Sequence, residues 1–406
     1  MEPKLNVAVI FDQEAQSGGG FYQSISLAIG LKSLQKKSIS IQFFTFKVKT
    51  LEELKNHGIK TNIIKSNPVI KFFDYFANLI NKSRVFPFRR YINFSTYFES
   101  YLYKKNIDIV IFLSPSNYAK SLDKLNFIFP VWDLCHRDEL EFPEVRHKNE
   151  IIRRDSLYKD ILPRAVAIIS ESKLGKENLI RRYGIDEERI FIQPFKPTQQ
   201  VGKKTSNIEF KNLLEKYSLD MKYIFYPAQF WAHKNHIYII DAIKILKKEF
   251  SINLGVIFCG TDKGNLNYVK DYVASHNLEK NIRYAGYIDS SEINDLYKHT
   301  LALVMPTYFG PTNLPPLEAF QMEVPLIYPD KKGLRDQVGD AALLMNLTNP
   351  HSLALHLKEL IENPKIAESL IQKGKEQLSK INKYDNLEEM REILDNFYHK
   401  RKCWKK

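Results

Sequence analysis

The sequence predicts an α/β fold built from two Rossmann-like, doubly wound domains. Short β-branched strands alternate with amphipathic helices in each half, and a Pro-, Gly- and Lys-rich segment interrupts this pattern at residues 194–207. The length of 406 residues agrees, because a domain usually holds roughly 100 to 200 residues. We expect one domain at residues 1–196, a second at 208–385, and a helix at 386–406 that packs back on the first domain.

The first domain is predicted from a series of short apolar runs in the N-terminal half. In order these are LNVAVIF, the helical FYQSISLAIGLKSLQK, ISIQFFTF, IDIVIFLSP, FIFPVWD, AVAIISES, the helical KLGKENLIRRYG and RIFIQPF. Strands of this kind separated by helical periods are typical of parallel βαβ units.

The second domain repeats the alternation after the linker. Its runs are YIFYPAQ, a helix at 235–249, INLGVIFCG, NIRYAGYI, a helix at 290–299, LALVMPT, PPLEAFQM, VPLIYPD and AALLMN, with a charged helical tail from about 350. Ligands of doubly wound sheets bind outside the carboxyl ends of the strands. We therefore expect the two domains to face each other across a cleft that forms the site.

Composition excludes several classes of protein. Apolar residues make up 44% of the chain and charged residues 26%, which is ordinary for a globular protein. The three cysteines form no C-x-x-C pair, which argues against a disulfide framework or a zinc module. No run of about 18 uncharged apolar residues occurs, so we expect a cytoplasmic protein without a signal peptide or transmembrane helix.

The net charge of +13 is concentrated in one stretch of the first domain. Residues 60–105 contain nine basic residues, two acidic residues and many aromatic residues. Basic groups interleaved with aromatics suit an anionic bilayer surface, but the same pattern arises from a solvated helix face above core aromatics. We keep both interpretations open and expect no nucleic-acid partner.

A glycine-rich turn, residues 17–20, follows the first strand and precedes the first helix. Without side chains, Gly18, Gly19 and Gly20 would let backbone N–H groups approach phosphate oxygens at a helix N-terminus, although a turn without ligand is the simpler alternative. The spacing is neither G-x-G-x-x-G nor a Walker A loop, which argues against dinucleotide oxidoreduction.

Lys234 lies in the segment YPAQFWAHKNH, between the first strand and first helix of the second domain. A lysine at this strand end can meet a phosphate oxygen, whereas a solvated charge is the simpler interpretation of any one lysine. His233 and His236 form an H-x-x-H pattern with no nearby carboxylate in sequence, so we expect no metal site.

The segment PTYFGPTNLPPLEAF, residues 306–320, predicts an irregular loop. We expect Glu318 in the first turn of the next helix, where the helix dipole favours a carboxylate that can hold vicinal hydroxyls. A loop that offers backbone N–H groups and ends in one carboxylate suits a nucleoside diphosphate with its ribose.

These residues resemble the retaining GT-B glycosyltransferases of family 4. That family carries an Arg with a Lys five positions later, which here are Gln229 and Lys234, and an E-x7-E motif, which here reads Gly310 and Glu318. FGPTNLPPLEA is similar to a variant found in a bacterial subgroup. The resemblance implies that Gln229, Lys234 and Glu318 bind the donor, together with the loop residues Thr312, Asn313 and Leu314.

The first domain resembles the same family at FPVWDLCHR, residues 129–137. Family members have an H-D-L motif here, with the histidine near the donor sugar. In this chain Trp132 stands at the histidine position, Asp133 follows it, and His136 comes four residues later. Either Asp133 or His136 can carry the polar contact, while a structural histidine is the simpler alternative.

The resemblance implies retaining transfer of a sugar from a nucleoside-diphosphate sugar to a hydroxyl of a saccharide acceptor, with no cofactor and no obligatory metal. The expected acceptor is a cell-surface saccharide of lipopolysaccharide, O-antigen or capsule type, lipid-linked at the inner face of the cytoplasmic membrane. Two alternatives stay open: a sugar-nucleotide epimerase or hydrolase on the same fold, and a catalytically inactive partner of another transferase.

Overall fold

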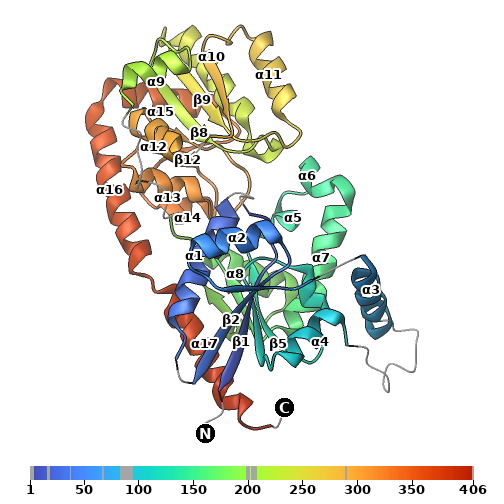
Figure 1. The fold of residues 1–406 in the computed structure, drawn as a ribbon. Coiled ribbons are helices and arrows are strands. Elements are labelled where there is room, and N and C mark those ends of the chain that lie inside the picture. The colour runs from blue at the N-terminus through green and yellow to red at the C-terminus, as the bar shows by residue number, and fades with distance from the viewer. Residues whose placement is uncertain are drawn as a thin grey trace. The chain divides into compact units, whose positions relative to one another are not determined.

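The computed structural model describes all residues except 1–3, 16–18, 37, 66–67, 83–94, 198–201, 203–207, 289 and 405–406. The chain divides into two compact units (Figure 1). Unit 1 comprises Met1–Leu134, Ile152–Pro194 and Asp385–Lys406, and unit 2 comprises Cys135–Ile151 and Phe195–Tyr384.

Unit 1 is built around a parallel sheet of seven strands in the order β3-β2-β1-β4-β5-β6-β7. The strands are β1 (Leu5–Phe11), β2 (Ile39–Thr45), β3 (Thr61–Ile63), β4 (Ile109–Phe112), β5 (Asn126–Val131), β6 (Ala167–Ser170) and β7 (Ile190–Ile192). Alternate side chains of β1 enter cores on opposite faces, with Val7 and Val9 in one and Ala8 and Ile10 in the other. Burial on both faces explains why these strands are almost continuously apolar.

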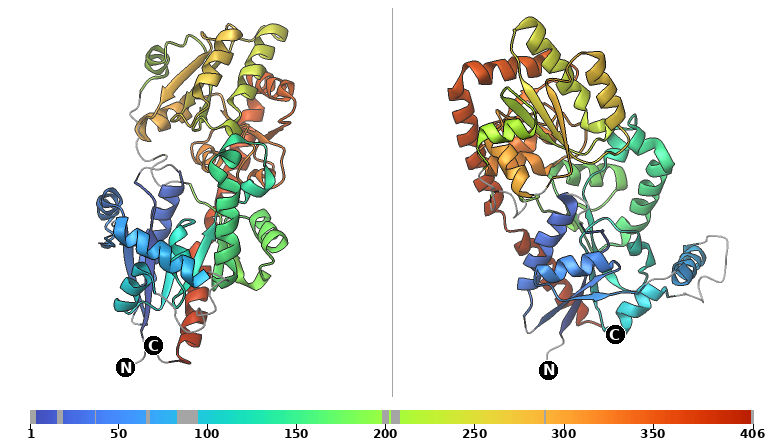
Figure 2. Two further views of the ribbon diagram at one scale, coloured as in Figure 1. Left: turned by 90° about the vertical axis from the view of Figure 1, so that its right-hand side faces the viewer. Right: turned by 45° about the horizontal axis from the view of Figure 1, so that its top comes forward.

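Helices cover both faces of the first sheet. The helices of unit 1 are α1 (Gly19–Ser33), α2 (Val48–Asn56), α3 (Pro68–Lys82), α4 (Tyr97–Lys104), α7 (Glu150–Ile161), α8 (Lys173–Tyr183) and α17 (Asn386–Arg401), with short 3-10 helices η2 (Asn117–Ser121), η4 (Leu162–Arg164) and η5 (Glu187–Arg189). Figure 2 shows α3 at the periphery of unit 1, where α4 and η2 are its neighbours.

The last helix, α17, belongs to unit 1. Leu387 packs so closely on Gly30 of α1 that a Cβ at Gly30 would lie 2.7 Å from the leucine. Arg401 Nε donates to Asp108 Oδ1 over 3.0 Å, and four apolar residues of α17 enter the core beneath α1: Met390, Ile393, Leu394 and Phe397. Buried apolar contacts therefore fix this helix.

Unit 2 repeats the architecture with a six-stranded parallel sheet in the order β10-β9-β8-β11-β12-β13. Its strands are β8 (Tyr223–Pro227), β9 (Gly255–Cys259), β10 (Ile282–Gly286), β11 (Leu303–Val304), β12 (Leu326–Pro329) and β13 (Leu343–Met345). Its helices are α5 (Cys135–Asp138), α6 (Pro143–Arg146), η3 (His147–Asn149), α9 (Phe210–Lys216), η6 (Ala232–Lys234), α10 (His236–Glu249), α11 (Leu266–Ser275), α12 (Ser290–His299), α13 (Leu314–Gln321), α14 (Leu334–Val338), α15 (Pro350–Glu362) and α16 (Pro364–Lys383). Two parallel sheets with covering helices confirm the predicted α/β class.

The segment Cys135–Ile151 groups with unit 2, although it lies inside the range 1–196 that we predicted as one domain. The physical reason is a set of contacts with the loops of unit 2. Phe142 packs on Tyr308 and Phe309 with ring centroids 5.3 and 5.1 Å apart, and Glu144 Oε1 accepts from His233 N over 2.9 Å. The alternation of strands and helices gives no sign of this exchange.

Candidate active site

Lys234 ends a single 3-10 turn, η6, between β8 and α10. The turn is closed by Asn235, whose φ of 54° is left-handed, and the Tyr226 hydroxyl donates to the Lys234 carbonyl over 2.8 Å. The Lys234 side chain is half-buried. Burial lowers the pKa of Lys234 to about 8, and the neighbouring Cys135 and Glu144 oppose this shift in part, so the ammonium group is still the main form at neutral pH.

Asn313 lies next to this lysine and is fixed on several sides. Lys234 Nζ is 3.4 Å from Asn313 Oδ1, and Asn313 Nδ2 donates to the Tyr328 hydroxyl over 2.8 Å. Gln337 forms a paired bond with the Asn313 backbone: Asn313 N donates to Oε1 over 3.0 Å, and Nε2 donates to the Asn313 carbonyl over 2.6 Å. A cation and an amide are therefore held beyond neighbouring strand ends, where open α/β sheets bind their ligands, and such a pair can bind phosphate oxygens.

The loop at residues 310–313 contains a buried polar atom that lacks a hydrogen bond to any described residue. The Thr312 Oγ1 atom is buried and has no hydrogen-bond partner among the described residues. Gly310 has a φ of 87°, and its N–H donates to Cys135 Sγ over 3.4 Å. Leu314 is almost fully buried and begins α13. Thr312 thus keeps a buried hydroxyl without a partner among the described residues, whereas Leu314 anchors the loop.

Glu318 lies in the second turn of α13, and our prediction of the first turn was wrong. The helix begins at Leu314 because Pro315 and Pro316 occupy its first turn, where proline is tolerated for lack of an N–H requirement. We had placed these prolines in the loop. Glu318 Oε2 instead accepts from the buried Tyr297 hydroxyl over 3.0 Å, so a side chain rather than the helix terminus orients it.

Gln229, which the resemblance predicts to replace an arginine, is hydrogen-bonded to a residue of the same loop. Trp231 Nε1 donates to Gln229 Oε1 over 3.1 Å, and Lys263 Nζ lies 5.9 Å from the centre of the Trp231 ring. His236 is fully buried against Phe230, with ring centroids 4.4 Å apart, and burial lowers its pKa to about 3. A neutral histidine in an aromatic cluster has a packing role.

His233 and Glu144 connect the segment Cys135–Ile151 to the turn that holds Lys234. His233 Nδ1 pairs with Glu144 Oε1, and the His233 ring stacks on Phe309 at 4.1 Å. Burial would raise the pKa of Glu144, but hydrogen bonds from the His233 side chain and backbone outweigh it and lower that pKa. Tyr308 N also donates to the His233 carbonyl over 3.0 Å, so this pair supports both loops around Lys234.

Asp133 and His136 fall in different units. Asp133 follows β5 in unit 1 and is bound by Arg154, whose Nη2 lies 2.7 Å from Oδ1 and 2.9 Å from the Asp133 carbonyl. His136 lies in α5 of unit 2 and is fully buried. The structure thus gives Asp133 an evident structural partner and His136 a buried position.

The glycine-rich turn lies only partly within the described residues. Gly18 falls outside them, and Gly19 and Gly20 are the first residues of α1. A Cβ at Gly20 would lie 2.7 Å from two ring carbons of Trp132. Gly20 is therefore required for the close packing of Trp132.

Sequence reasoning missed three groups that shape this region: Gln337, Tyr328 and Glu144. Gln337 and Tyr328 come from α14 and β12, and their partner Asn313 precedes α13. A polar tyrosine in the apolar run VPLIYPD was the available signal, because a buried tyrosine hydroxyl needs a partner. Glu144 gave no such signal.

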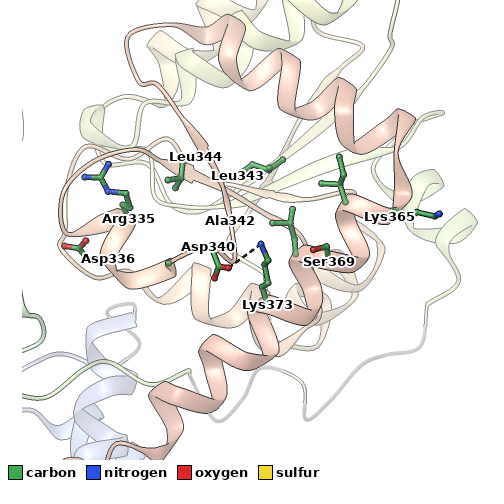
Figure 3. Close-up of a pocket in the computed structure, with 12 residues that line it drawn as sticks. Arg335, Asp336, Asp340, Ala342, Leu343, Leu344, Lys365, Ser369 and Lys373 are labelled. Atoms are coloured by element: carbon green, nitrogen blue, oxygen red, sulfur yellow. Dashed lines mark ion pairs between the residues drawn. The ribbon is translucent and has the colours of Figure 1, made fainter.

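A separate pocket of about 720 Å³ occurs in unit 2 (Figure 3). It is formed by the end of α14, the amino end of β13 and the first half of α16, and Lys373 Nζ pairs with Asp340 Oδ2 over 3.3 Å at its wall. None of the predicted site residues lines it. In the described part of the chain, no three His, Cys, Asp or Glu side chains are grouped to hold a metal ion.

Comparison with known proteins supports these assignments of fold. Residues 209–377 match the profile of the family described as Glycosyl transferases group 1. The chain is 23% identical over 222 residues to O-antigen chain mannosyltransferase B of Escherichia coli, a match that covers 54% of this chain and 58% of that protein. The chain thus spans little more than half the length of this curated relative.

Solved structures are similar over nearly the whole chain. A glycosyltransferase from Rickettsia africae superposes with a TM-score of 0.70 at 18% identity, over 97% of this chain and 99% of that chain. Anabaena HepE, solved in complex with UDP and glucose, gives 0.69 at 13% identity over the same shares. The predicted fold, two Rossmann-like domains of GT-B type, is confirmed.

Proposed function

We propose that this protein is a glycosyltransferase that moves a sugar from a nucleoside-diphosphate sugar to a hydroxyl of a cell-surface saccharide. The observation that carries the proposal is the half-buried Lys234 beside Asn313 at the carboxyl ends of β8 and β11. Both lie within the segment that matches the Glycosyl transferases group 1 family.

The chemistry follows from the charge that develops on the leaving group. When the bond between the anomeric carbon and the phosphate oxygen breaks, negative charge grows on the departing diphosphate. Lys234 Nζ, the Thr312 hydroxyl and backbone N–H groups of the loop before α13 would stabilise that charge with little reorganisation. The acceptor oxygen then bonds to the anomeric carbon, and its proton passes to the diphosphate on the same face. This sequence retains the anomeric configuration and needs no metal.

The relatives suggest the class of acceptor. One curated relative is an O-antigen chain mannosyltransferase, and another is a capsular polysaccharide biosynthesis glycosyltransferase of Staphylococcus aureus. We therefore propose a lipopolysaccharide, O-antigen or capsule saccharide as the acceptor, lipid-linked at the cytoplasmic face of the membrane. The donor base and sugar stay open.

Turnover of nucleotide sugars tests the function. The purified protein is incubated with a panel of nucleoside-diphosphate sugars, with and without saccharide acceptors, and release of the nucleoside diphosphate is measured. We expect release that depends on acceptor and persists in EDTA, with NMR of the product showing a retained anomeric configuration. Rapid turnover without acceptor would favour the epimerase or hydrolase, and absence of any nucleotide binding would favour the inactive partner.

We further propose that α3 holds the protein on an anionic membrane. Val69, Phe72, Phe73 and Phe76 follow the spacing i, i+3, i+4 and i+7, and between 47% and 65% of each side chain is exposed. Asp74, on the opposite side of the helix, accepts from Tyr97 N of α4 over 2.6 Å. The apolar stripe therefore faces away from α4. The alternative interpretation, in which the aromatic side chains are buried in the core below a solvated helix face, does not hold for the aromatic side chains of this stripe.

A helix with an exposed aromatic stripe in the most basic stretch of the chain suits the bilayer interface. Each Lys or Arg near an anionic surface contributes on the order of 1 kcal/mol. Three of the basic residues in the stretch 60–105 that would contact the anionic bilayer lie outside the described residues: Arg84, Arg89 and Arg90. None of the described helices is long and apolar enough to cross a bilayer, so any attachment through them would be peripheral.

Sedimentation with lipid vesicles tests this attachment. We expect the wild type to bind anionic vesicles in low salt, and Phe72→Ser with Phe76→Ser to reduce the bound fraction several-fold. Ile152→Ser, which removes an equally exposed apolar side chain from α7, is the matched control. A second arm reverses the charges of Lys82, Arg84, Arg89 and Arg90 to Glu. Equal binding of all variants, or none by the wild type, would contradict the proposal.

A further inference from the structure

Glu171 is a buried carboxyl group that no described residue satisfies. It follows β6 directly, only 3% of it is exposed, and neither carboxylate oxygen has a hydrogen-bond partner in the described part of the chain. It is not a helix cap, because Ser172 caps α8 by accepting from Gly175 N over 3.0 Å. A buried polar group without a partner costs stability, and native proteins keep few of them.

The position of Glu171 places it at the carboxyl edge of the first sheet, next to Asp133. Val131 of β5 and Ser170 of β6 are paired in register, and Glu171 follows that pair by one residue and Asp133 by two, so the two acids lie beyond adjacent strand ends. Arg154 already binds Asp133, and its guanidinium lies 5.9 Å from the centre of the buried Tyr158 ring. Burial, with the negative charge of Asp133 as a smaller cause, raises the pKa of Glu171 well above its usual range.

A raised pKa favours the protonated form of the Glu171 carboxyl group. It can donate one hydrogen bond through its O–H and accept another through its carbonyl oxygen, which is the pattern that an alcohol hydroxyl completes. A second acid of this edge, Asp12 after β1, also has its pKa raised by burial despite a hydrogen bond from Ser116.

We propose that Glu171, beside Asp133, forms a binding site for a saccharide hydroxyl in unit 1 and contacts the acceptor. The inference rests on the proposed function, which supplies the saccharide class, and adds a residue that neither the family motifs nor the sequence pattern indicate. Glu171 contacts the acceptor in this account through hydrogen bonds and takes no part in the chemical step.

Two substitutions separate binding from structure. Glu171→Gln keeps a neutral donor and acceptor of the same length, whereas Glu171→Met keeps the length and removes every polar atom. Because the folded pKa of Glu171 is raised, the stability of the wild type falls as pH rises above the ordinary glutamate pKa, until the folded group also ionises. We expect both variants to lose this slope and Glu171→Met to melt no lower than the wild type.

Saturation-transfer NMR then tests the site with methyl α-mannoside and methyl β-galactoside as probes. We expect saturation transfer to at least one glycoside in the wild type, at least half of it in Glu171→Gln, and about a tenfold loss of affinity in Glu171→Met, the change for one hydrogen bond of about 1.4 kcal/mol. Unchanged affinity in Glu171→Met, a large fall in its melting temperature, or no transfer in the wild type would overturn the proposal.

The result that would contradict the proposed transferase function differs from the result that would contradict the Glu171 site. If the glycosides bind through Glu171 but no nucleoside-diphosphate sugar is bound or consumed, the hydroxyl site stands and the transferase assignment falls. If nucleotide sugars are turned over with equal acceptor affinity in all three proteins, the assignment stands and the Glu171 site falls.

Discussion

The two sheets share one strand order but carry opposite chemistry at the same place. In unit 1 the order reverses between β1 and β4, and in unit 2 between β8 and β11. At the first of these points Asp12 is bound by Ser116, and at the second Lys234 lies 3.4 Å from Asn313. The fold therefore supplies the position of a site, and the residue type decides the charge of the ligand.

The residues around these two sheet edges also differ. Close to Lys234, the Asn313 side chain is hydrogen-bonded to Tyr328 and the Asn313 backbone to Gln337. A diphosphate would therefore meet a cation and an amide that are already held in position. At the edge of the first sheet, Glu171 has no partner among the described residues and Asp133 is taken by Arg154. We infer that the sheet edge of unit 2 binds an anion and that of unit 1 binds neutral hydroxyl groups.

The largest expected effect comes from removing the cation. Lys234→Ala is predicted to reduce turnover by about two to three orders of magnitude, the usual loss for one preorganised charge stabiliser, with a nearly unchanged melting temperature. Lys248→Ala, an exposed lysine at the far end of α10, is the control. An unaltered turnover rate in Lys234→Ala would show that this lysine is not part of the active site, and the contrast between the two sheet edges would then lose its basis.

The same lysine gives a pH dependence. Its pKa is about 8, so the charged form is present below that pH and is lost as the pH rises through it. We expect kcat/KM, which reports the free enzyme, to fall above about pH 8 in the wild type and to stay level longer in Lys234→Arg, because arginine keeps its charge. Identical profiles for the two proteins would contradict this assignment.

Glu318→Gln should weaken donor binding by a loss of roughly 1.5 to 3 kcal/mol, the value for a hydrogen bond to a charged group. Calorimetric titration with the donor measures it. Tyr297→Phe, which removes only the hydroxyl that orients Glu318, should cause a smaller loss in the same direction. If donor affinity is unchanged while Glu318→Gln unfolds more easily, the carboxylate has only a structural role.

His136 and Asp133 can be ordered by activity. We expect His136→Ala to cut turnover more than Asp133→Asn, provided that circular dichroism stays normal. Asp133→Asn should mainly lower stability, by roughly 1 to 2 kcal/mol, because the partly buried Arg154 loses its charged partner. The reverse order of activity would assign the polar contact to Asp133.

The elements of both sheets could be predicted because alternating apolar runs reflect burial on two faces. The donor region was predictable in part: Lys234 and Asn313 do lie together, but Glu318 was placed one turn too early because the prolines were assigned to the loop. Glu171 was hidden in the strand pattern AVAIISES. Its lack of partners among the described residues is a property of three-dimensional packing, which no local pattern records.

The most direct test of the central claim is nucleotide binding by the wild type, Lys234→Ala and Lys248→Ala. Each protein is titrated with nucleoside diphosphates and nucleoside-diphosphate sugars, and the shift in melting temperature is recorded. The account predicts a clear shift with at least one diphosphate in the wild type and Lys248→Ala, and a strongly reduced shift in Lys234→Ala. No shift with any diphosphate, or equal shifts in all three proteins, would contradict the claim that unit 2 binds the donor through Lys234.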